Sequence, residues 1–131
     1  KSDENKKSFV SLLDDPKTIT KKIKSAMTDS SGEISYDKEN KAGVSNLLTI
    51  YSSFANRPID DIVAEYQGAG YGKFKQDLAD VVISILEPMQ ERHAKLMASS
   101  ELDDILADGA KKANEVANET LAAMEKAIGF R

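Results

Sequence analysis

The sequence predicts an all-α fold, an antiparallel bundle of five helices. Apolar residues recur at intervals of three and four along most of the chain, as in helices that bury one face. The strict alternation of apolar and polar residues that marks a half-buried strand is nearly absent. A chain of 131 residues can bury one domain-sized core.

The first part of the chain combines a loop, a short apolar run and one helix. Residues 1–8 are polar and charged and predict a loop, and the apolar run Phe9 to Leu13 fits an extended strand. Asp15 predicts a helix start, because its carboxylate can accept from free amides and Pro16 loses no hydrogen bond at the first helical position. The apolar face of this helix comprises Ile19, Ile23 and Met27.

A long loop and four further helices are predicted next. Residues 28–43 are rich in Asp, Ser, Gly and Lys and lack a periodic pattern, so they predict the loop. The second helix has a core-facing stripe of Val44, Leu47, Leu48, Tyr51 and Phe54. The third helix begins after Pro58 and ends at Gly68.

The last two helices are long. The fourth follows the glycine-rich turn 68–72 and contains Pro88, which is expected to kink it by removing one backbone hydrogen bond. Ser100 to Asp103 predicts a capping box at the start of the fifth helix. This helix ends at Gly129.

Charge and cysteine content restrict the function. Eighteen basic and 22 acidic residues give a net charge of −4, which argues against a dedicated nucleic-acid binder but permits a local basic patch. The absence of cysteine excludes disulfides and thiolate metal sites and suits the cytosol. No apolar run approaches the ~20 residues that span a bilayer. We therefore expect a cytoplasmic protein without membrane contact.

Short sequence pieces follow one another in a recognisable order along the whole chain. They are Lys1-Ser2, Leu12-Leu13-Asp14-Asp15-Pro16, Gly43 to Leu48, Gly70-Tyr71-Gly72, Gln90-Glu91-Arg92 and Gly129-Phe130. Together they resemble the segment that follows the KMSKS signature in tryptophanyl-tRNA synthetases, a family of class I aminoacyl-tRNA synthetases. Lys1 and Ser2 correspond to the last two residues of that signature.

The resemblance implies a domain organisation. Residues 1–14 would be the remainder of the KMSKS loop and of the linker from a Rossmann-type catalytic domain. Residues 15–131 would form the α-helical anticodon-binding domain, with its last helix packing back on the catalytic domain. His93 is the only histidine, so the histidine-rich ATP signature would lie outside this sequence. The chain is thus expected to be a C-terminal fragment.

The same resemblance implies the activity and the partners of the parent protein. The parent would be a homodimer that activates tryptophan with ATP and Mg²⁺ and charges tRNA(Trp). Lys1 would be the catalytic residue, since a mobile cation can meet the charge that develops on the ATP phosphates. Ser2 would shape the loop or donate to a phosphate. The fragment alone is expected to be inactive and to bind no cofactor or metal.

Three groups of side chains are candidates for tRNA binding. Lys17, Lys21, Lys22 and Lys24 place four cations within eight residues, a pattern that suits phosphate contacts and equally suits a solvated helix face. Beside the glycine-rich turn, Tyr71, Lys73 and Lys75 combine cations with a ring on which a base could stack. For Tyr71, covering the end of the bundle is the favoured interpretation. Arg92 is the third candidate.

Two alternatives remain open. A tyrosyl-tRNA synthetase shares the same catalytic logic, although the Gly70-Tyr71-Gly72 and Gly129-Phe130 pieces favour the tryptophanyl type. A non-enzymatic helical module that binds a partner through an apolar face is the alternative from another functional class.

Overall fold

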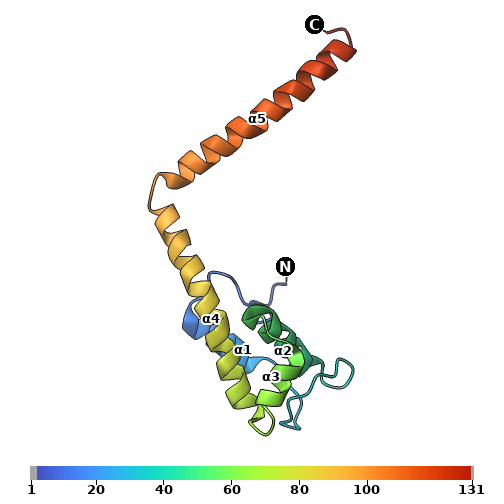
Figure 1. Cartoon of the computed structure of the whole chain (residues 1–131). Helices are drawn as coiled ribbons and strands as arrows, with labels where there is room; N and C mark the ends of the chain where they lie inside the picture. Colours follow the sequence, from blue (N-terminus) through green and yellow to red (C-terminus); the bar gives the residue numbers. More distant parts are fainter. Residues whose placement is uncertain (1–2, 131) are drawn as a thin grey trace. The chain divides into compact units, whose positions relative to one another are not determined.

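The computed structural model describes residues 3–130. It contains five helices, α1 (Pro16–Ser25), α2 (Ala42–Ala55), α3 (Ile59–Glu65), α4 (Gly70–Met97) and α5 (Glu101–Ala127) (Figure 1). No strand occurs within the described range, so the all-α prediction is confirmed. None of the helices described is long and apolar enough to cross a membrane.

The segment Phe9 to Leu13 is not a strand, contrary to the sequence prediction. Its backbone turns instead, because the Asp14 carboxylate accepts from the amide of Ser11 at 2.8 Å and the Asp14 amide donates to the Ser11 carbonyl at 3.1 Å. An apolar run alone does not distinguish a strand from an irregular segment that packs on helices.

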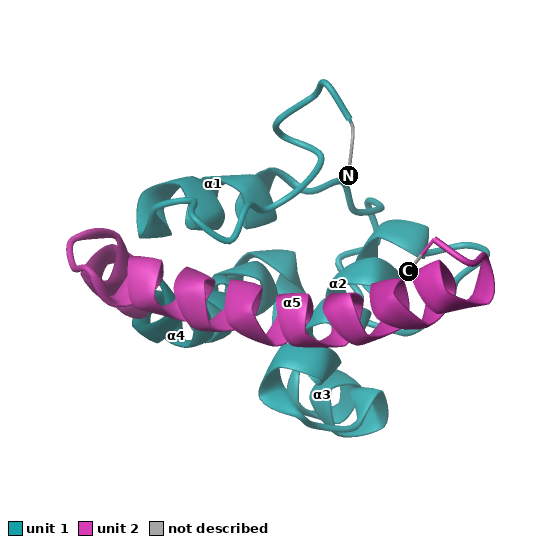
Figure 2. Ribbon diagram, turned by 90° about the horizontal axis from the view of Figure 1, so that it is seen from above, with its two compact units in different colours: residues 1–90 teal, residues 91–131 magenta. Residues whose placement is uncertain are grey.

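The chain divides into two compact units, residues 1–90 and 91–131 (Figure 2). The division lies inside α4, two residues after Pro88. The helix continues through this proline, although Pro88 has no amide hydrogen to donate to the preceding turn.

The first unit contains the hydrophobic core. Its centre is an aromatic cluster in which the rings of Tyr51, Tyr66 and Phe74 lie 5.3–6.0 Å apart, at separations that favour edge and tilted contacts. Side chains from α1, α2, α3, α4 and the long loop surround the cluster. They are Ile19, Ile23, Ile34, Val44, Leu47, Leu48, Ile62, Leu78, Ala79, Val82 and Leu86.

Local chemistry accounts for the start of α1. The Asp15 carboxylate accepts from the amides of Lys17 and Thr18, and Pro16 occupies the first turn, as predicted. These hydrogen bonds lower the pKa of Asp15, with the Thr18 hydroxyl making the largest contribution. These contacts fix the start of α1 at Pro16, three residues after Leu13, the last apolar residue of the preceding segment.

The loop between α1 and α2 enters the core at Ile34, and its first residues pass close to the start of α2. Ile34 is buried, although nothing in the sequence pattern around it predicts burial. Near the start of α2, a Cβ atom on Gly43 would lie 2.2 Å from the Met27 carbonyl oxygen, so only glycine fits this close approach.

In the second unit, α5 has no buried residue. Its exposed large apolar residues are Ile105, Leu106, Val116, Leu121 and Met124. The predicted capping box is wrong: Ser100 makes no side-chain cap, because its backbone (φ −76°, ψ −5°) is already helical rather than extended. The hydroxyl of Ser99 accepts from the Glu101 amide instead, at 3.3 Å.

Candidate nucleic-acid interface

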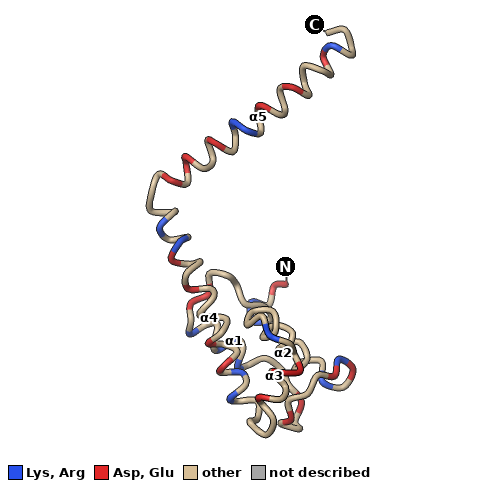
Figure 3. Tube along the Cα trace, in the orientation of Figure 1, with Lys and Arg blue, Asp and Glu red and all other residues tan. Residues whose placement is uncertain are grey.

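Helix α1 presents a row of three exposed lysines. Lys17, Lys21 and Lys24 are spaced at i, i+4 and i+7, which places them on one side of the helix. None of the three forms an ion pair with an acid among residues 3–130. Figure 3 marks the positions of the described Lys and Arg residues along the chain in blue. We call this row the α1 lysine face.

Lys22, the fourth predicted cation, has a different environment. Its ammonium lies 2.6 Å from Asp14 Oδ2, with only 13% and 18% of the two side chains exposed. It also lies 5.3 Å from the centre of the Phe9 ring. The hydrogen bond from Lys22 is the main cause of the lowered pKa of Asp14. Lys22 therefore ties the segment before α1 to the helix, and it does not belong to the α1 lysine face.

Lys75 is buried and caps the C-terminal end of α1. Its ammonium donates to the carbonyl of Ala26 at 2.8 Å and to the hydroxyl of Thr28 at 3.1 Å, with the Lys24 carbonyl at 3.5 Å. A cation at the C-terminus of a helix satisfies free carbonyls and complements the helix dipole. Burial lowers the pKa of Lys75. These contacts occupy the ammonium, so we leave Lys75 out of the interface.

Tyr71 holds the long loop against the start of α4. Its hydroxyl donates to Asp29 Oδ2 at 2.7 Å and lies 2.9 Å from the carbonyl of Glu33. Burial raises the pKa of Tyr71. The pKa of Asp29 is strongly lowered, first by the Ser31 hydroxyl and then by Tyr71. The Tyr71 ring is half-buried, an environment that suits attachment of the loop better than stacking on a base.

Lys73 belongs to a chain of polar side chains that enters the aromatic cluster. Its ammonium pairs with Asp77, which raises the pKa of Lys73. Asp77 also accepts from the hydroxyl of Tyr66 at 2.7 Å, and that hydroxyl lies 3.0 Å from the hydroxyl of Tyr51. Burial is the main cause of the raised pKa of Tyr66. Lys73 is thus exposed but paired.

The remaining predicted site residues are Arg92, Lys1 and Ser2. Arg92 is exposed in the second unit, and its guanidinium lies 3.8 Å from Glu101. Lys1 and Ser2 lie outside the described residues. Over residues 3–130 there is no group of three or more His, Cys, Asp or Glu side chains that could hold a metal ion.

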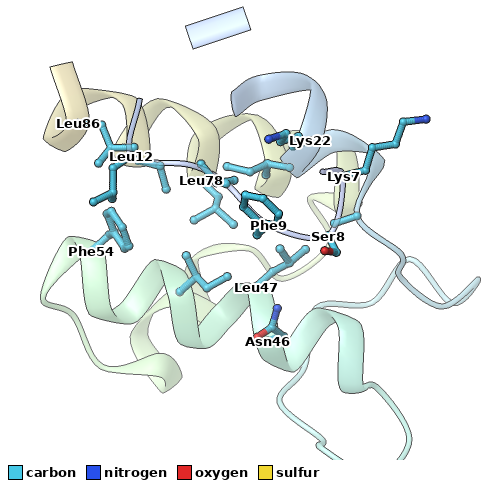
Figure 4. A pocket seen from close by; sticks show the side chains of 15 residues that line it. Lys7, Ser8, Phe9, Leu12, Lys22, Asn46, Leu47, Phe54, Leu78 and Leu86 are labelled. Carbon is cyan, nitrogen blue, oxygen red and sulfur yellow. The ribbon is translucent and has the colours of Figure 1, made fainter. Parts of the chain in front are cut away.

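An apolar pocket of about 310 Å³ lies between the segment before α1 and helices α1, α2 and α4 (Figure 4). Phe9, Val10 and Leu12 contribute to it from the segment, and Phe54, Leu78 and Leu86 from the helices. The pocket shows that residues 7–12 lie on the helical core of the first unit.

Comparison with known proteins assigns the family. The family described as tRNA synthetases class I (W and Y) matches residues 1–87, about two thirds of the chain. The chain belongs to this family. The predicted resemblance to class I synthetases is therefore confirmed.

Relatives of this class I synthetase chain carry the name tryptophan–tRNA ligase. Those of Bacillus subtilis, Bacillus anthracis and Listeria monocytogenes are 56%, 57% and 58% identical to it over 130 residues. The match covers 99% of this chain and 39–40% of each relative. The chain thus spans about two fifths of the length of these curated relatives.

A solved structure shares the fold of this class I synthetase chain. The crystal structure of tryptophanyl-tRNA synthetase from Mycoplasma pneumoniae superimposes with a TM-score of 0.79 at 25% identity. The superposition covers 98% of this chain and 40% of that one.

Proposed function

We propose that the chain is the helical, tRNA-binding part of a tryptophan–tRNA ligase. The whole protein would activate tryptophan with ATP and transfer it to tRNA(Trp), acting as a homodimer. The observation that carries the proposal is 53–58% identity to tryptophan–tRNA ligases over 99% of the chain. Residues 1–14 would connect to the catalytic domain, and residues 15–131 would be the anticodon-binding domain.

The α1 lysine face is the surface proposed to contact tRNA. Its three ammonium groups are exposed and have no internal partner in the part of the chain described, so they can neutralise phosphates without first breaking ion pairs. Such contacts would position the RNA and would not read its sequence. Lys73 and Arg92 are weaker candidates, because each is already beside a carboxylate.

The proposal for Lys1 and Ser2 rests on the sequence alone. Lys1 would stabilise the negative charge that moves onto the ATP phosphates as tryptophan is activated, and Ser2 would donate to a phosphate or shape the loop. Mg²⁺ would accompany the ATP and neutralise phosphate charge. Its ligands would come from ATP, water and the rest of the protein, since the described residues offer no ligand cluster.

Helix α5 is proposed to pack against the rest of the same protein. Its apolar residues are exposed here, and the curated relatives are about two and a half times as long as this chain. Exposed apolar area of this kind normally marks an interface. The isolated chain is therefore expected to self-associate, which light scattering would show; a strict monomer would contradict this expectation.

Amino-acid-dependent exchange between ATP and pyrophosphate tests the proposed reaction. The full-length protein that contains this chain should catalyse the exchange with tryptophan and not with tyrosine. Exchange driven by tyrosine would favour the other branch of the family, and no exchange with either amino acid would refute the proposal.

The salt dependence of tRNA binding tests the proposed surface. In the full-length protein, Lys17, Lys21 and Lys24 would be replaced together by Gln. Each lost phosphate contact lowers the log–log salt slope by about 0.7–0.9, so the expected total is roughly 2–3. The control replaces Lys111, Lys112 and Lys126 of α5 by Gln, which removes the same charge from another helix. If both triple variants had the same log–log salt slope, the α1 lysines would not be phosphate contacts and would be ordinary solvated side chains.

A further inference from the structure

The end of the long loop lies against the start of α2 and leaves a hollow there. The hollow has a volume of about 320 Å³ and is lined by Lys38, Ala42, Ser45, Asn46 and Thr49. All of these residues except Ser45 are exposed, so the hollow opens to solvent. A ligand bound in it can therefore remain part of a longer chain. We call it the loop–α2 hollow.

Hydrogen bonds fix the loop side of the loop–α2 hollow. The amide of Asp37 donates to the hydroxyl of the buried residue Ser45 at 2.9 Å. The carboxylate of Asp37 accepts from the amides of Glu39 and Asn40, both at 3.0 Å. The turn that carries Lys38 is therefore formed without a ligand, and binding need not order it first.

Tyr36 presents an aromatic ring at the rim of the loop–α2 hollow. Its hydroxyl lies beside two residues that line the hollow: hydrogen bonding by the Thr49 hydroxyl, and then by the Lys38 ammonium, lowers the pKa of Tyr36. These contacts hold the ring at its hydroxyl end, while 39% of the residue remains exposed. A fixed and exposed ring offers a flat surface on which a nucleobase can stack.

Two side chains that line the hollow have polar groups available to a ligand. Lys38 is the one charged residue among those that line it, and its ammonium pairs with no acid over residues 3–130. The side-chain amide of Asn46 has no hydrogen-bond partner in the same range. An ammonium suits a phosphate, and an amide offers donors and an acceptor to the edge of a base.

A ring, an amide and a cation around one open hollow are the groups with which proteins bind unpaired nucleotides. We propose that the loop–α2 hollow binds one unpaired base of the tRNA. The base stacks on Tyr36, its edge faces the amide of Asn46, and the adjoining phosphate lies near Lys38. This inference rests on the proposed function. It adds a contact that distinguishes bases, which phosphate contacts at the α1 lysine face do not.

Binding of the full-length protein to altered tRNA(Trp) transcripts is the first test. Each transcript lacks one base of the unpaired loops but keeps the sugar and the phosphate. Tyr36→Ala should raise the Kd for the intact transcript about tenfold, within the range for truncation of a stacking ring. For the one transcript that lacks the stacked base, the same substitution should change the Kd by less than about twofold. Tyr36→Phe, which keeps the ring, should bind every transcript as wild type does.

A direct base contact and a general effect on the fold give different results in this test. If Tyr36→Ala weakened the binding of every transcript equally, the residue would support the fold and touch no base. If Tyr36→Ala weakened the binding of no transcript, the ring would not contact tRNA. Either result would overturn the inference.

Base preference in Asn46→Asp is the second test, and it does not depend on how well Tyr36→Ala folds. Asn46 is exposed, and the substitution removes its donors while keeping its size. With transcripts that carry each of the four bases at each loop position, Asn46→Asp should change the order of Kd values at one position. That position should be the one at which base removal abolishes the effect of Tyr36→Ala.

Asn118→Asp is the matched control, because Asn118 is exposed on α5 and the substitution makes the same change of charge. It should leave the order of Kd values as in wild type. An Asn46→Asp protein with the wild-type order at every position would overturn the inference. A wild-type protein that did not bind intact tRNA(Trp) would instead refute the proposed function, and this result is seen before any variant is compared.

Discussion

Replacing Lys75 by Met tests whether this buried lysine is a helix cap or a tRNA contact. Methionine keeps a long apolar side chain but removes every donor. The carbonyl of Ala26 and the hydroxyl of Thr28 then lose a charged partner at 2.8 Å and 3.1 Å, in a part-buried site. A hydrogen bond to a charged group contributes about 1.5–3 kcal/mol.

The expected loss of unfolding free energy in Lys75→Met is smaller than the summed free energies of the two hydrogen bonds. Burying the charged ammonium group of Lys75 removes it from water and destabilises the fold, as the lowered pKa of Lys75 reflects. Methionine carries no charge and so avoids this destabilisation. We therefore expect Lys75→Met to lower the free energy of unfolding by about 2 kcal/mol. Urea unfolding of the 131-residue chain, followed by circular dichroism, measures this change.

Lys73→Met is the matched control on the same helix. Lys73 is 63% exposed, forms an i, i+4 ion pair with Asp77, and its ammonium lies 5.3 Å from the centre of the Tyr66 ring. Both interactions are weak at an exposed site, so Lys73→Met should lower the free energy of unfolding by no more than about 1 kcal/mol. Equal destabilisation by the two substitutions would refute the assignment of Lys75 as a cap. Weaker tRNA binding by Lys75→Met at unchanged stability would make Lys75 a contact residue after all.

The pH dependence of stability gives an independent check on Lys75. Its pKa is lowered in the folded chain from the ordinary value of 10.5, so between the two values the unfolded chain binds the additional proton. The free energy of unfolding therefore rises with pH in that window. The difference between wild type and Lys75→Met should increase as the pH approaches 10.5. A decreasing difference would mean that the carbonyls raise the pKa more than burial lowers it.

Two further predictions concern a tight backbone contact and the proposed catalytic lysine. Gly43→Ala should lower the free energy of unfolding by about 1–3 kcal/mol, because the new Cβ would lie 2.2 Å from the Met27 oxygen. Gly109→Ala in α5 meets open space and should be neutral or stabilising; thermal melts compare the two. In the full-length protein, Lys1→Ala should slow tryptophan activation by about 10²–10³ with little change in substrate binding. A normal activation rate together with a lower melting temperature would mean that Lys1 is not a catalytic residue.

Features that depend on neighbouring residues were predictable from the sequence. The start of α1 follows from Asp15 and Pro16, whose cap requires only the next few amides. The buried stripe of α2 follows from the spacing of Val44, Leu48 and Tyr51. Family membership was predictable because short pieces of sequence occur in order along the chain.

Features that depend on distant residues were not predictable. Lys73 and Lys75 have similar sequence surroundings, and only the approach of the α1 C-terminus, 49 positions from Lys75, buries one and leaves the other exposed. Lys22 and Lys21 differ in the same way, because Asp14 folds back beside only one of them. Ile34 lies in a loop without periodicity, so no pattern could indicate its burial.

The most direct test of α1 as a tRNA-binding surface compares two reactions of the full-length protein. In the variant with Lys17, Lys21 and Lys24 replaced by Gln, the KM for tRNA(Trp) in the charging reaction should rise at least about tenfold. Tryptophan-dependent exchange between ATP and pyrophosphate, which needs no tRNA, should remain normal. An unchanged KM for tRNA(Trp), with exchange intact, would contradict the account of α1 as a tRNA-binding surface.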